Sequence, residues 1–292
     1  MPFVLITGAS RGIGYEFLRQ YSSDAKNTVI ALVRNKSATE KKVSEDAVLQ
    51  GRPNIYILQA DITDYNALKQ AAADTAEITG GSLDYIIANA GLVPKFDLFL
   101  PIGELYVLQT SLIGNSFLLT LQNRGKQPGE LTKTFREAFE INVIGNVHLF
   151  NLFLPLILAG HVKKIVTITS GLADNSFTNQ WGATPGALYA ASKAAMNTVV
   201  AKFNAQFKKD GVLFLAVCPG PVEVGHYDGA TADDLAAVEP LLSIFKEYSP
   251  GYERPKAPEV SVRMMRDVIE ASSLEKGDGG AFVSHYGNQQ WV

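Results

Sequence analysis

Short apolar runs rich in β-branched residues alternate with longer stretches of helical periodicity along the whole chain. The runs predict strands at residues 3–7, 28–33, 55–59, 84–88, 164–169, 212–217 and 281–284. The stretches between and after them predict helices at 12–22, 64–79, 131–158, 187–209 and 259–273. Several strands are apolar on both faces, which is typical of a parallel sheet covered on both sides. The alternation therefore predicts an α/β fold, with a doubly wound parallel sheet of about seven strands and helices on both faces.

The composition favours an ordinary globular enzyme or binding protein. Hydrophobic residues make up 47% of the 292 residues and charged residues 19%, and no Pro/Gly-rich linker or internal repeat divides the chain. We therefore expect a single domain over residues 1–292. The net charge of −3 gives no reason to expect nucleic acid as a partner.

We expect the protein to be cytoplasmic. We expect neither a membrane-spanning segment nor a metal site. Cys218 is the single cysteine, which excludes an intrachain disulfide and fits a reducing compartment. The longest apolar stretch, 149–159, is interrupted by Asn151 and Pro155 and is too short to span a bilayer. The four histidines are scattered without ligand spacing, so no metal site is expected.

A glycine-rich loop, TGASRGIG at residues 7–14, lies between the first predicted strand and the first helix. Its glycines are Gly8, Gly12 and Gly14, and the residues between them include Ser10, Arg11 and Ile13. Glycine permits a tight turn and a close approach of backbone to ligand, and a helix N-terminus attracts phosphate. In this context the loop predicts a dinucleotide site of the Rossmann type. A plain strand–helix turn would also explain a loop of this kind.

The end of the second strand carries Arg34, where an NAD site usually has an acid for the ribose 2′-hydroxyl. Arg11 lies within the glycine loop itself. Guanidinium groups grip a phosphate by two hydrogen bonds at once. The two arginines therefore favour NADP(H) as the cofactor, and the alternative is that both are ordinary solvated side chains.

Tyr189 and Lys193 stand four residues apart in a stretch of small residues, LYAASKAAMN. This spacing places both side chains on one helical face. A cation about 4 Å from a phenolate stabilises it by roughly 4 kcal/mol at an intermediate dielectric, which is roughly three pKa units. The lysine is therefore expected to bring the tyrosine toward the pKa of an effective acid–base catalyst. A half-exposed tyrosine beside a solvated lysine is the alternative.

Five motifs in this order resemble the short-chain dehydrogenase/reductase family. They are TGASRGIG at 7–14, DIT at 61–63, NAG at 89–91, YAASK at 189–193 and PGPV at 219–222. The resemblance covers essentially the whole chain. The C-terminal stretch also looks like the end of fungal ketoreductases and C-factor-like carbonyl reductases.

The resemblance implies a role for each matching residue. Cofactor contacts are implied for Asp61 and Ile62 at the adenine, for Asn89, Ala90 and Gly91 along the adenosine ribose, and for Pro219, Gly220 and Val222 at the nicotinamide end. Catalytic roles are implied for Tyr189 as acid/base, Lys193 at the nicotinamide ribose, Ser170 at the substrate carbonyl and Asn142 at a proton-relay water.

Three features depart from the family pattern. Val224 stands where the family often has threonine, and Tyr189 lies 19 positions after Ser170, which is longer than the commonest spacing. Asn142 lies 53 positions after Asn89, about double the usual spacing, so the segment near 97–130 looks inserted. A substrate lid, an oligomer contact and translated intron sequence remain open as its explanation.

A second excursion, residues 225–258, is expected to be the substrate loop. Its Tyr227, Leu241, Leu242, Phe245 and Tyr248, together with Phe177 and Trp181, predict an apolar aromatic wall. Such a wall suits a bulky aromatic or polyketide-like ketone of secondary metabolism, although the same side chains would also serve to pack the loop on the core.

The sequence therefore predicts an NADPH-dependent ketoreductase that acts on a small-molecule carbonyl substrate. An NADP-dependent alcohol dehydrogenase running oxidatively and a non-catalytic NADP(H)-binding regulator remain as alternatives. A homodimer or homotetramer is expected.

Overall fold

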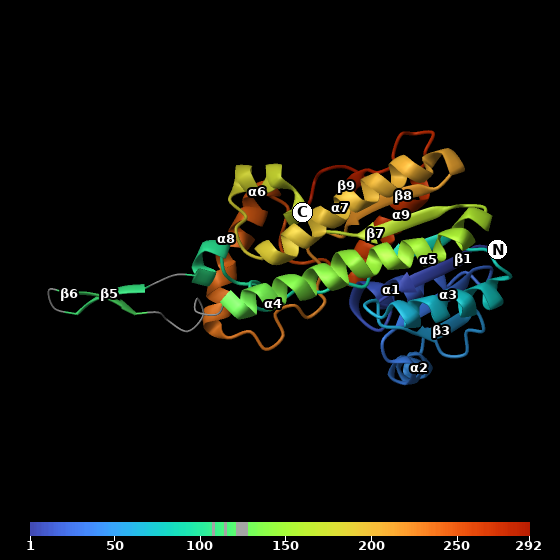
Figure 1. Cartoon of the computed structure of the whole chain (residues 1–292), viewed down its shortest axis with the longest axis horizontal. Helices are drawn as coiled ribbons and strands as arrows, with labels where there is room; N and C mark the ends of the chain where they lie inside the picture. The colour runs from blue at the N-terminus through green and yellow to red at the C-terminus, as the bar shows by residue number, and fades with distance from the viewer. Residues whose placement is uncertain (107–108, 114–115, 121–127) are drawn as a thin grey trace.

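The computed structural model describes residues 1–106, 109–113, 116–120 and 128–292. Its centre is a seven-stranded parallel sheet with the order β3-β2-β1-β4-β7-β8-β9 (Figure 1). The strands of this sheet are β1 Phe3–Thr7, β2 Thr28–Val33, β3 Ile55–Gln59, β4 Tyr85–Ala88, β7 Lys164–Ile168, β8 Leu213–Cys218 and β9 Phe282–Ser284. The predicted α/β fold is confirmed, and each predicted strand lies within one residue of the observed bounds.

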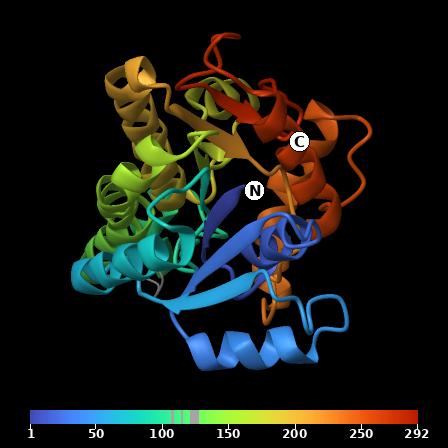
Figure 2. The same ribbon diagram turned by 90° about the vertical axis from the view of Figure 1, so that its right-hand side faces the viewer.

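Helices cover both faces of the sheet, and two apolar cores lie between the layers. The helices are α1 Gly12–Tyr21, α2 Lys36–Glu45, α3 Tyr65–Thr79, α4 Pro128–Phe139, α5 Gly145–Ala159, α6 Asn175–Trp181, α7 Ala187–Phe207, α8 Ala232–Tyr248 and α9 Pro258–Ala271. One core joins the sheet to α3, α5 and α7, and the other joins it to α1 and α9. Figure 2 shows these two groups of helices on opposite sides of the sheet.

Three helices were absent from the sequence prediction. α2 is polar and buries only Thr39 among its residues, so it shows little apolar periodicity. α8 occupies much of the segment 225–258, which the sequence predicted as a loop. It begins at a capping box formed by Thr231 and Asp234, and it contains Pro240. α6 lies in the long connection between Ser170 and Tyr189.

The predicted helix 131–158 is longer and less regular than expected. α4 continues through a π-helical turn, Glu140–Ile144, directly into α5. The resulting segment Pro128–Ala159 has 32 residues and is apolar enough, by length and composition, to cross a membrane. Core helices of water-soluble proteins meet the same criterion. Here α5 contributes Leu149, Phe150 and Phe153 to the core, and half of the most apolar window is buried in the molecule.

The segment predicted as an insertion, 97–130, begins against the body of the protein and lies partly outside the described residues. Asp97 and Leu105 are buried, and Pro101 forms a β-bridge with Pro185. A short 3-10 helix, Ile102–Tyr106, follows. Beyond it, β5 Gln109–Ile113 and β6 Ser116–Thr120 form a separate antiparallel pair (Figure 1).

Candidate active site

The strand order reverses between β1 and β4, so the chain leaves these neighbouring strands in opposite directions. In doubly wound sheets the crevice at such a switch point, outside the carboxyl ends of the strands, is where ligands bind. A cavity of about 680 Å³ lies there. It is lined by the loops that follow β1, β2, β3, β4, β7 and β8.

Nearly all residues predicted for the site line this one cavity. They are Gly8, Ser10, Arg11, Gly12, Ile13, Arg34, Asp61, Ile62, Asn89, Ala90, Gly91, Ser170, Tyr189, Lys193, Pro219, Gly220 and Val222. Gly14 and Asn142 do not line it and act from behind, as described below. The structure thus brings together segments that are up to 214 residues apart, from Gly8 to Val222.

The glycine loop has the shape of a phosphate cradle. Gly8 and Gly12 have positive φ angles of 68° and 56°, and a Cβ on Gly8 would lie 2.9 Å from Ala90 Cα. A Cβ on Gly14 would lie 2.4 Å from both Gly8 O and Asn89 Nδ2. α1 begins after Arg11 without a side-chain cap, so its first N–H groups remain available to a ligand. These features fit the pyrophosphate of a dinucleotide.

Asn89 fixes the loop against β4. Its Nδ2 donates to Thr7 O at 3.0 Å and to Gly8 O at 3.3 Å, while its backbone N–H donates to the Thr7 hydroxyl at 3.1 Å. The same Thr7 hydroxyl accepts from the Ala90 N–H at 3.0 Å. Asn89 therefore positions the turn after β1 as well as facing the cavity.

Cationic side chains gather where β2 ends. Arg34 follows β2 directly, Arg11 belongs to the glycine loop, and both are exposed and line the cavity. Among the ion pairs of the described residues, neither arginine pairs with a carboxylate. Lys42, which is not among the predicted site residues, donates to Ser10 O at 3.1 Å and lies 4.0 Å from the centroid of the Tyr15 ring. This end of the cavity suits an anionic group.

Tyr189 and Lys193 face the cavity from the first two turns of α7. The Lys193 ammonium donates to Ile168 O at 2.8 Å and lies 5.7 Å from the centroid of the Tyr189 ring. Burial lowers the pKa of Lys193 to about 8. Burial also raises the pKa of the Tyr189 phenol, and the Ser170 side chain opposes this rise.

The direction of the Tyr189 pKa shift is opposite to the one expected from the sequence. In the protein alone, the loss of water around the phenol is the largest cause of the shift, and the Lys193 ammonium donates its hydrogen bond to the Ile168 carbonyl. Burial therefore favours the protonated form of the phenol.

Asn142 lies on the π-helical turn, fully buried, and its side chain is occupied by the protein itself. Oδ1 accepts from the Leu92 N–H at 2.7 Å, and Nδ2 donates to Leu92 O at 2.9 Å and to the Ser192 hydroxyl at 2.9 Å. A Cβ on Gly91 would lie 3.2 Å from Asn142 Oδ1 and 3.3 Å from Lys193 Nζ. Asn142 thus holds the segment after β4, at Leu92, close to Lys193.

The turn after β8 is supported from below by polar and aromatic groups. The Cys218 thiol accepts from the N–H groups of Gly171 and Gly220, and burial raises its pKa to about 11. Ser261 donates to Pro219 O at 2.8 Å. The imidazole of His285 is buried directly beneath Gly220, where a Cβ would lie 2.5 Å from its Cε1. This packing fixes the turn that faces the cavity.

An aromatic and aliphatic wall lines the cavity, but it is formed by a partly different set of residues from the one predicted. Phe177, Tyr227, Leu241, Leu242 and Phe245 line the cavity as predicted.

Two of the predicted wall residues lie behind it. Trp181 and Tyr248 are absent from the lining, because their rings pack on each other with centroids 5.3 Å apart. Tyr252 and Trp291 also line the cavity, although they belong to none of the predicted site residues. Trp291 stacks on Phe282 at 4.3 Å and donates from Nε1 to Asp174 at 2.8 Å. Its position 102 residues after Tyr189 gave no local signal of this contact.

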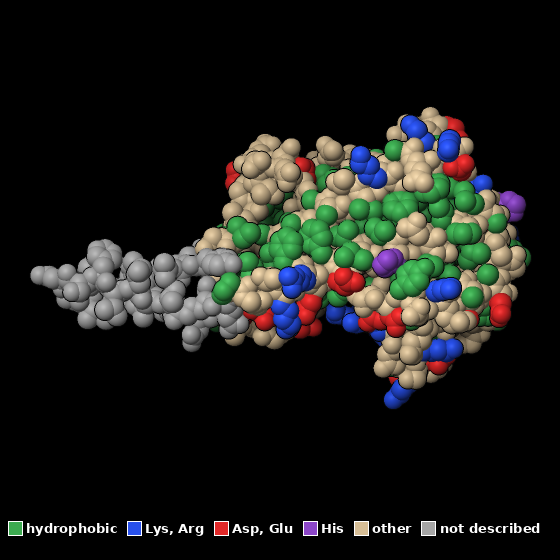
Figure 3. All heavy atoms as spheres, in the orientation of Figure 1, with side chains coloured by type: hydrophobic (Ala, Val, Ile, Leu, Met, Phe, Trp, Pro, Cys, Tyr) green, Lys and Arg blue, Asp and Glu red, His purple; other side chains and the backbone are tan. Residues whose placement is uncertain are grey.

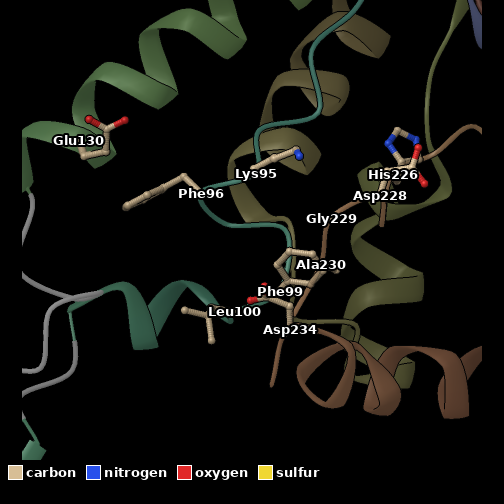
Figure 4. A pocket seen from close by; sticks show the side chains of 10 residues that line it. All are labelled: Lys95, Phe96, Phe99, Leu100, Glu130, His226, Asp228, Gly229, Ala230 and Asp234. Atoms are coloured by element: carbon tan, nitrogen blue, oxygen red, sulfur yellow. The ribbon is translucent and has the colours of Figure 1, made fainter. Parts of the chain in front are cut away.

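A smaller outer chamber of about 370 Å³ adjoins the cavity (Figure 4). Its lining comprises Lys95, Phe96, Phe99, Leu100, Glu130, His226, Asp228, Gly229, Ala230 and Asp234. Lys95, His226 and Asp228 belong to both linings, so the two spaces share a boundary. The outer chamber is more polar than the aromatic wall.

Comparisons with known proteins agree with this geometry. A sequence profile of the family described as short chain dehydrogenase matches residues 2–108 and 111–234. Short chain dehydrogenase virK of Hypocrea virens is 49% identical over 292 residues, which is all of this chain and all of that protein. Short-chain dehydrogenase/reductase iacC of Pestalotiopsis fici is 43% identical over 293 aligned residues, again over the full length of both.

Solved structures share the fold at low sequence identity. NADPH-bound carbonyl reductase from chicken fatty liver superposes with a TM-score of 0.66 at 22% identity, over 99% of this chain and 98% of that one. The KRED1-Pglu enzyme superposes with a TM-score of 0.70 at 18% identity, over 97% of this chain and 100% of that one.

Proposed function

The chain belongs to the short-chain dehydrogenase/reductase family, and on this premise we propose that it is an NADPH-dependent reductase of ketones. The observation that carries the proposal is the meeting of Ser170, Tyr189 and Lys193 with the glycine loop around one cavity at the switch point. The NADPH-bound carbonyl reductase among the structural neighbours supports the same cofactor and the same class of substrate.

The preference for NADP(H) over NAD(H) rests on charge. Arg34 stands where an acid would select the 2′-hydroxyl of NAD, and Arg11 and Lys42 add positive charge close by. In this proposal the guanidinium groups hold the 2′-phosphate, because their planar forks match phosphate oxygens.

The proposed reaction assigns the proton chemistry to this chain. NADPH, when bound, supplies the hydride that the carbonyl carbon accepts. The Ser170 and Tyr189 hydroxyls donate hydrogen bonds to the carbonyl oxygen, where negative charge develops. Tyr189 then gives its proton to that oxygen. Lys193, with a pKa of about 8, is a suitable source of the replacement proton.

The upward direction of the Tyr189 pKa shift is compatible with the reductive direction that we propose. A reductase needs the phenol in its protonated form, and burial raises its pKa, which favours that form at neutral pH. Asn142 has a positioning part in this proposal, since its side chain joins Leu92 to the helix of Tyr189 through Ser192.

We further propose a bulky aromatic or polyketide-like ketone of secondary metabolism as the substrate. The wall formed by Phe177, Tyr227, Leu241, Phe245 and Trp291 supports this class, because it offers aromatic and aliphatic contact but few groups that would bind a sugar.

We place this activity in a single cytoplasmic NADP-binding domain that forms a homodimer or homotetramer. Support for self-association comes from hydrophobic side chains that gather over α5 and the neighbouring α7 (Figure 3). Ile144, at the end of the π-helical turn before α5, is 41% exposed, and Leu158 in α5 is 37% exposed. Light scattering of the purified protein measures the oligomeric state, and a monomer at working concentration would contradict this part.

Turnover of a ketone panel tests the proposed function. Aromatic and polycyclic ketones are offered with NADPH or NADH, and cofactor oxidation is compared with the alcohol formed. We expect one alcohol to form for each NADPH oxidised. Bulky aromatic ketones are expected to be reduced faster than small aliphatic ones, and NADPH is expected to support a faster reaction than NADH. A protein that binds NADPH but reduces no ketone would support the non-catalytic alternative instead.

A further inference from the structure

The catalytic helix α7 starts without a cap of its own. Its N-cap residue is Gly186, which has a left-handed φ of 73° and no side chain to offer. The first N–H groups of a helix lack partners within the helix and need acceptors from elsewhere. This requirement is strict here, because Leu188 in the first turn is only 1% exposed.

Asp97 supplies the missing acceptor from 91 residues earlier in the chain. Its Oδ2 accepts from the Leu188 N–H at 2.6 Å, and its backbone carbonyl accepts from the Gly186 N–H at 2.9 Å. The β-bridge between Pro101 and Pro185 continues the same contact. Residues 97–101 therefore hold the start of α7 by both backbone and side chain.

The Asp97 carboxylate is fully buried, with an exposed fraction of 0%. No lysine, arginine or histidine among the described residues forms an ion pair with it. Burial raises its pKa, and the N–H groups of Leu188, Asp97 itself and Tyr189 counter this rise. The positive end of the α7 dipole is thus the charge that receives the carboxylate.

Tyr189 is the third residue of α7 and follows Leu188 directly. Any loosening of the first turn therefore moves the phenol relative to Ser170. We propose that Asp97 is a positioning residue for Tyr189, which it fixes by capping the catalytic helix. This inference rests on the proposed function, since Tyr189 is the general acid there.

The same segment also reaches the substrate side. Lys95, Phe96, Phe99 and Leu100 line the outer chamber (Figure 4). The chamber wall and the cap of the catalytic helix are therefore parts of one short stretch of chain. An altered cap is expected to act on the rate of the reaction more than on the binding of NADPH, because Asp97 contacts the start of α7 at Gly186 and Leu188 rather than the glycine loop.

Two substitutions of Asp97 test the inference against a matched control. Asp97→Ala removes the acceptor, and Asp97→Asn keeps the shape and one acceptor oxygen. Asp84 is the control, because it is also a buried carboxylate, 3% exposed, that accepts backbone N–H groups. Its partners are the N–H groups of Phe3, His161 and Val162, at the amino-terminal edge of the sheet.

The first measurement does not depend on activity. Hydrogen exchange followed by mass spectrometry reports the protection of the first turn of α7. We expect exchange there to be at least about tenfold faster in Asp97→Ala, and unchanged in Asp84→Asn and Asp84→Ala. Unchanged protection of this turn in folded Asp97→Ala would overturn the inference.

The second measurement is the single-turnover rate of ketone reduction. We expect Asp97→Ala to lose about tenfold to a hundredfold, as for a misplaced catalytic group, with the Kd of NADPH unchanged. The isotope effect with deuterated NADPH is expected to rise, since a slower chemical step becomes rate-limiting. A mere loss of folded protein would lower the amplitude and leave the isotope effect as it is.

The remaining outcomes separate the inference from the proposed function. If Asp97→Ala does not fold, Asp97→Asn is expected to show a smaller loss of the same kind. An equal loss of rate in the Asp84 variants would overturn the positioning role. If the wild-type protein reduces no ketone while α7 still responds to Asp97→Ala alone, the proposed function and the catalytic role of the cap fail, whereas the cap itself stands.

Discussion

Gly14→Ala is the sharpest perturbation of the predicted phosphate cradle. The added Cβ would lie 2.4 Å from Gly8 O, 2.4 Å from Asn89 Nδ2 and 2.9 Å from Gly8 C. Two of these three atoms are backbone, so the relief must come from a shift of the turn itself. A shift of the Asn89 side chain would disturb its hydrogen bonds to Thr7 O and Gly8 O.

The magnitude follows from these contacts. Overpacking of this kind costs about 1–3 kcal/mol, and a weakened buried hydrogen bond adds about 1 kcal/mol. We therefore expect the free energy of unfolding to fall by about 2–4 kcal/mol. A distorted turn also presents its N–H groups wrongly to a pyrophosphate, and a loss of about 1.4 kcal/mol in binding would weaken NADPH about tenfold.

Denaturant unfolding and a fluorescence titration with NADPH measure the two effects on the same sample. Gly129→Ala is the matched control, because it adds the same methyl group at a position where no atom of the described residues lies within 4 Å of it. We expect the control to keep its stability and its affinity. A Gly14→Ala protein with wild-type stability and wild-type NADPH affinity would refute the close packing of Gly8, Gly14 and Asn89.

Two further predictions concern charge. Arg34→Ala is expected to lower the ratio of NADPH to NADH affinity by about fivefold to thirtyfold, since an exposed cation near a phosphate contributes about 1–2 kcal/mol at surface dielectric values. Titration with both cofactors measures this ratio. An unchanged ratio would exclude Arg34 from the 2′-phosphate site. Burial and the Lys256 ammonium lower the pKa of His285 from 6.5 to about 4. The unfolded chain therefore takes up a proton between these values while the folded protein does not, so stability falls as the pH falls from about 7 to about 4, by about 3 kcal/mol. The free energy of unfolding, measured across this pH range, is expected to fall less steeply with falling pH in His285→Gln than in the wild type. An equal dependence on pH in both proteins would contradict the prediction.

The central sheet was predictable because its signal is local. Each strand of a parallel sheet covered on both faces reads as a short apolar run, and the core residues of β1, β2 and β8 are buried almost throughout. The helices α2 and α8 were missed for the opposite reason. α2 buries almost nothing, and α8 lies in a segment rich in turn-forming residues.

The candidate site was predictable where its residues belong to contiguous motifs. Three such motifs can be identified from a few neighbouring residues each: the glycine loop, the Tyr189–Lys193 pair and the turn at 219–222. All three contribute to the cavity lining. Trp291 and Asp97 do not, because their roles arise only when distant segments meet on folding. Trp291 reaches Asp174 from 117 residues away, and Asp97 reaches Leu188 from 91.

The direction of the Tyr189 pKa shift also could not be predicted from the sequence. A spacing of four predicts the neighbourhood of Lys193 but not the degree of burial, and burial decides the direction of the pKa shift. The side-chain contacts of Asn142 are a similar case, since its partner Leu92 lies 50 residues away.

The most direct measurement is the single-turnover rate of NADPH oxidation by a ketone substrate in wild type and in Tyr189→Phe, with the Kd of NADPH determined on the same samples. Tyr21→Phe serves as the control, because its hydroxyl is buried in the other core and has no hydrogen-bond partner within the described part of the chain. We predict a rate at least about a hundredfold lower in Tyr189→Phe, from the loss of general-acid catalysis, at an unchanged Kd. A Tyr189→Phe protein that reduces the ketone as fast as the wild type would contradict the account.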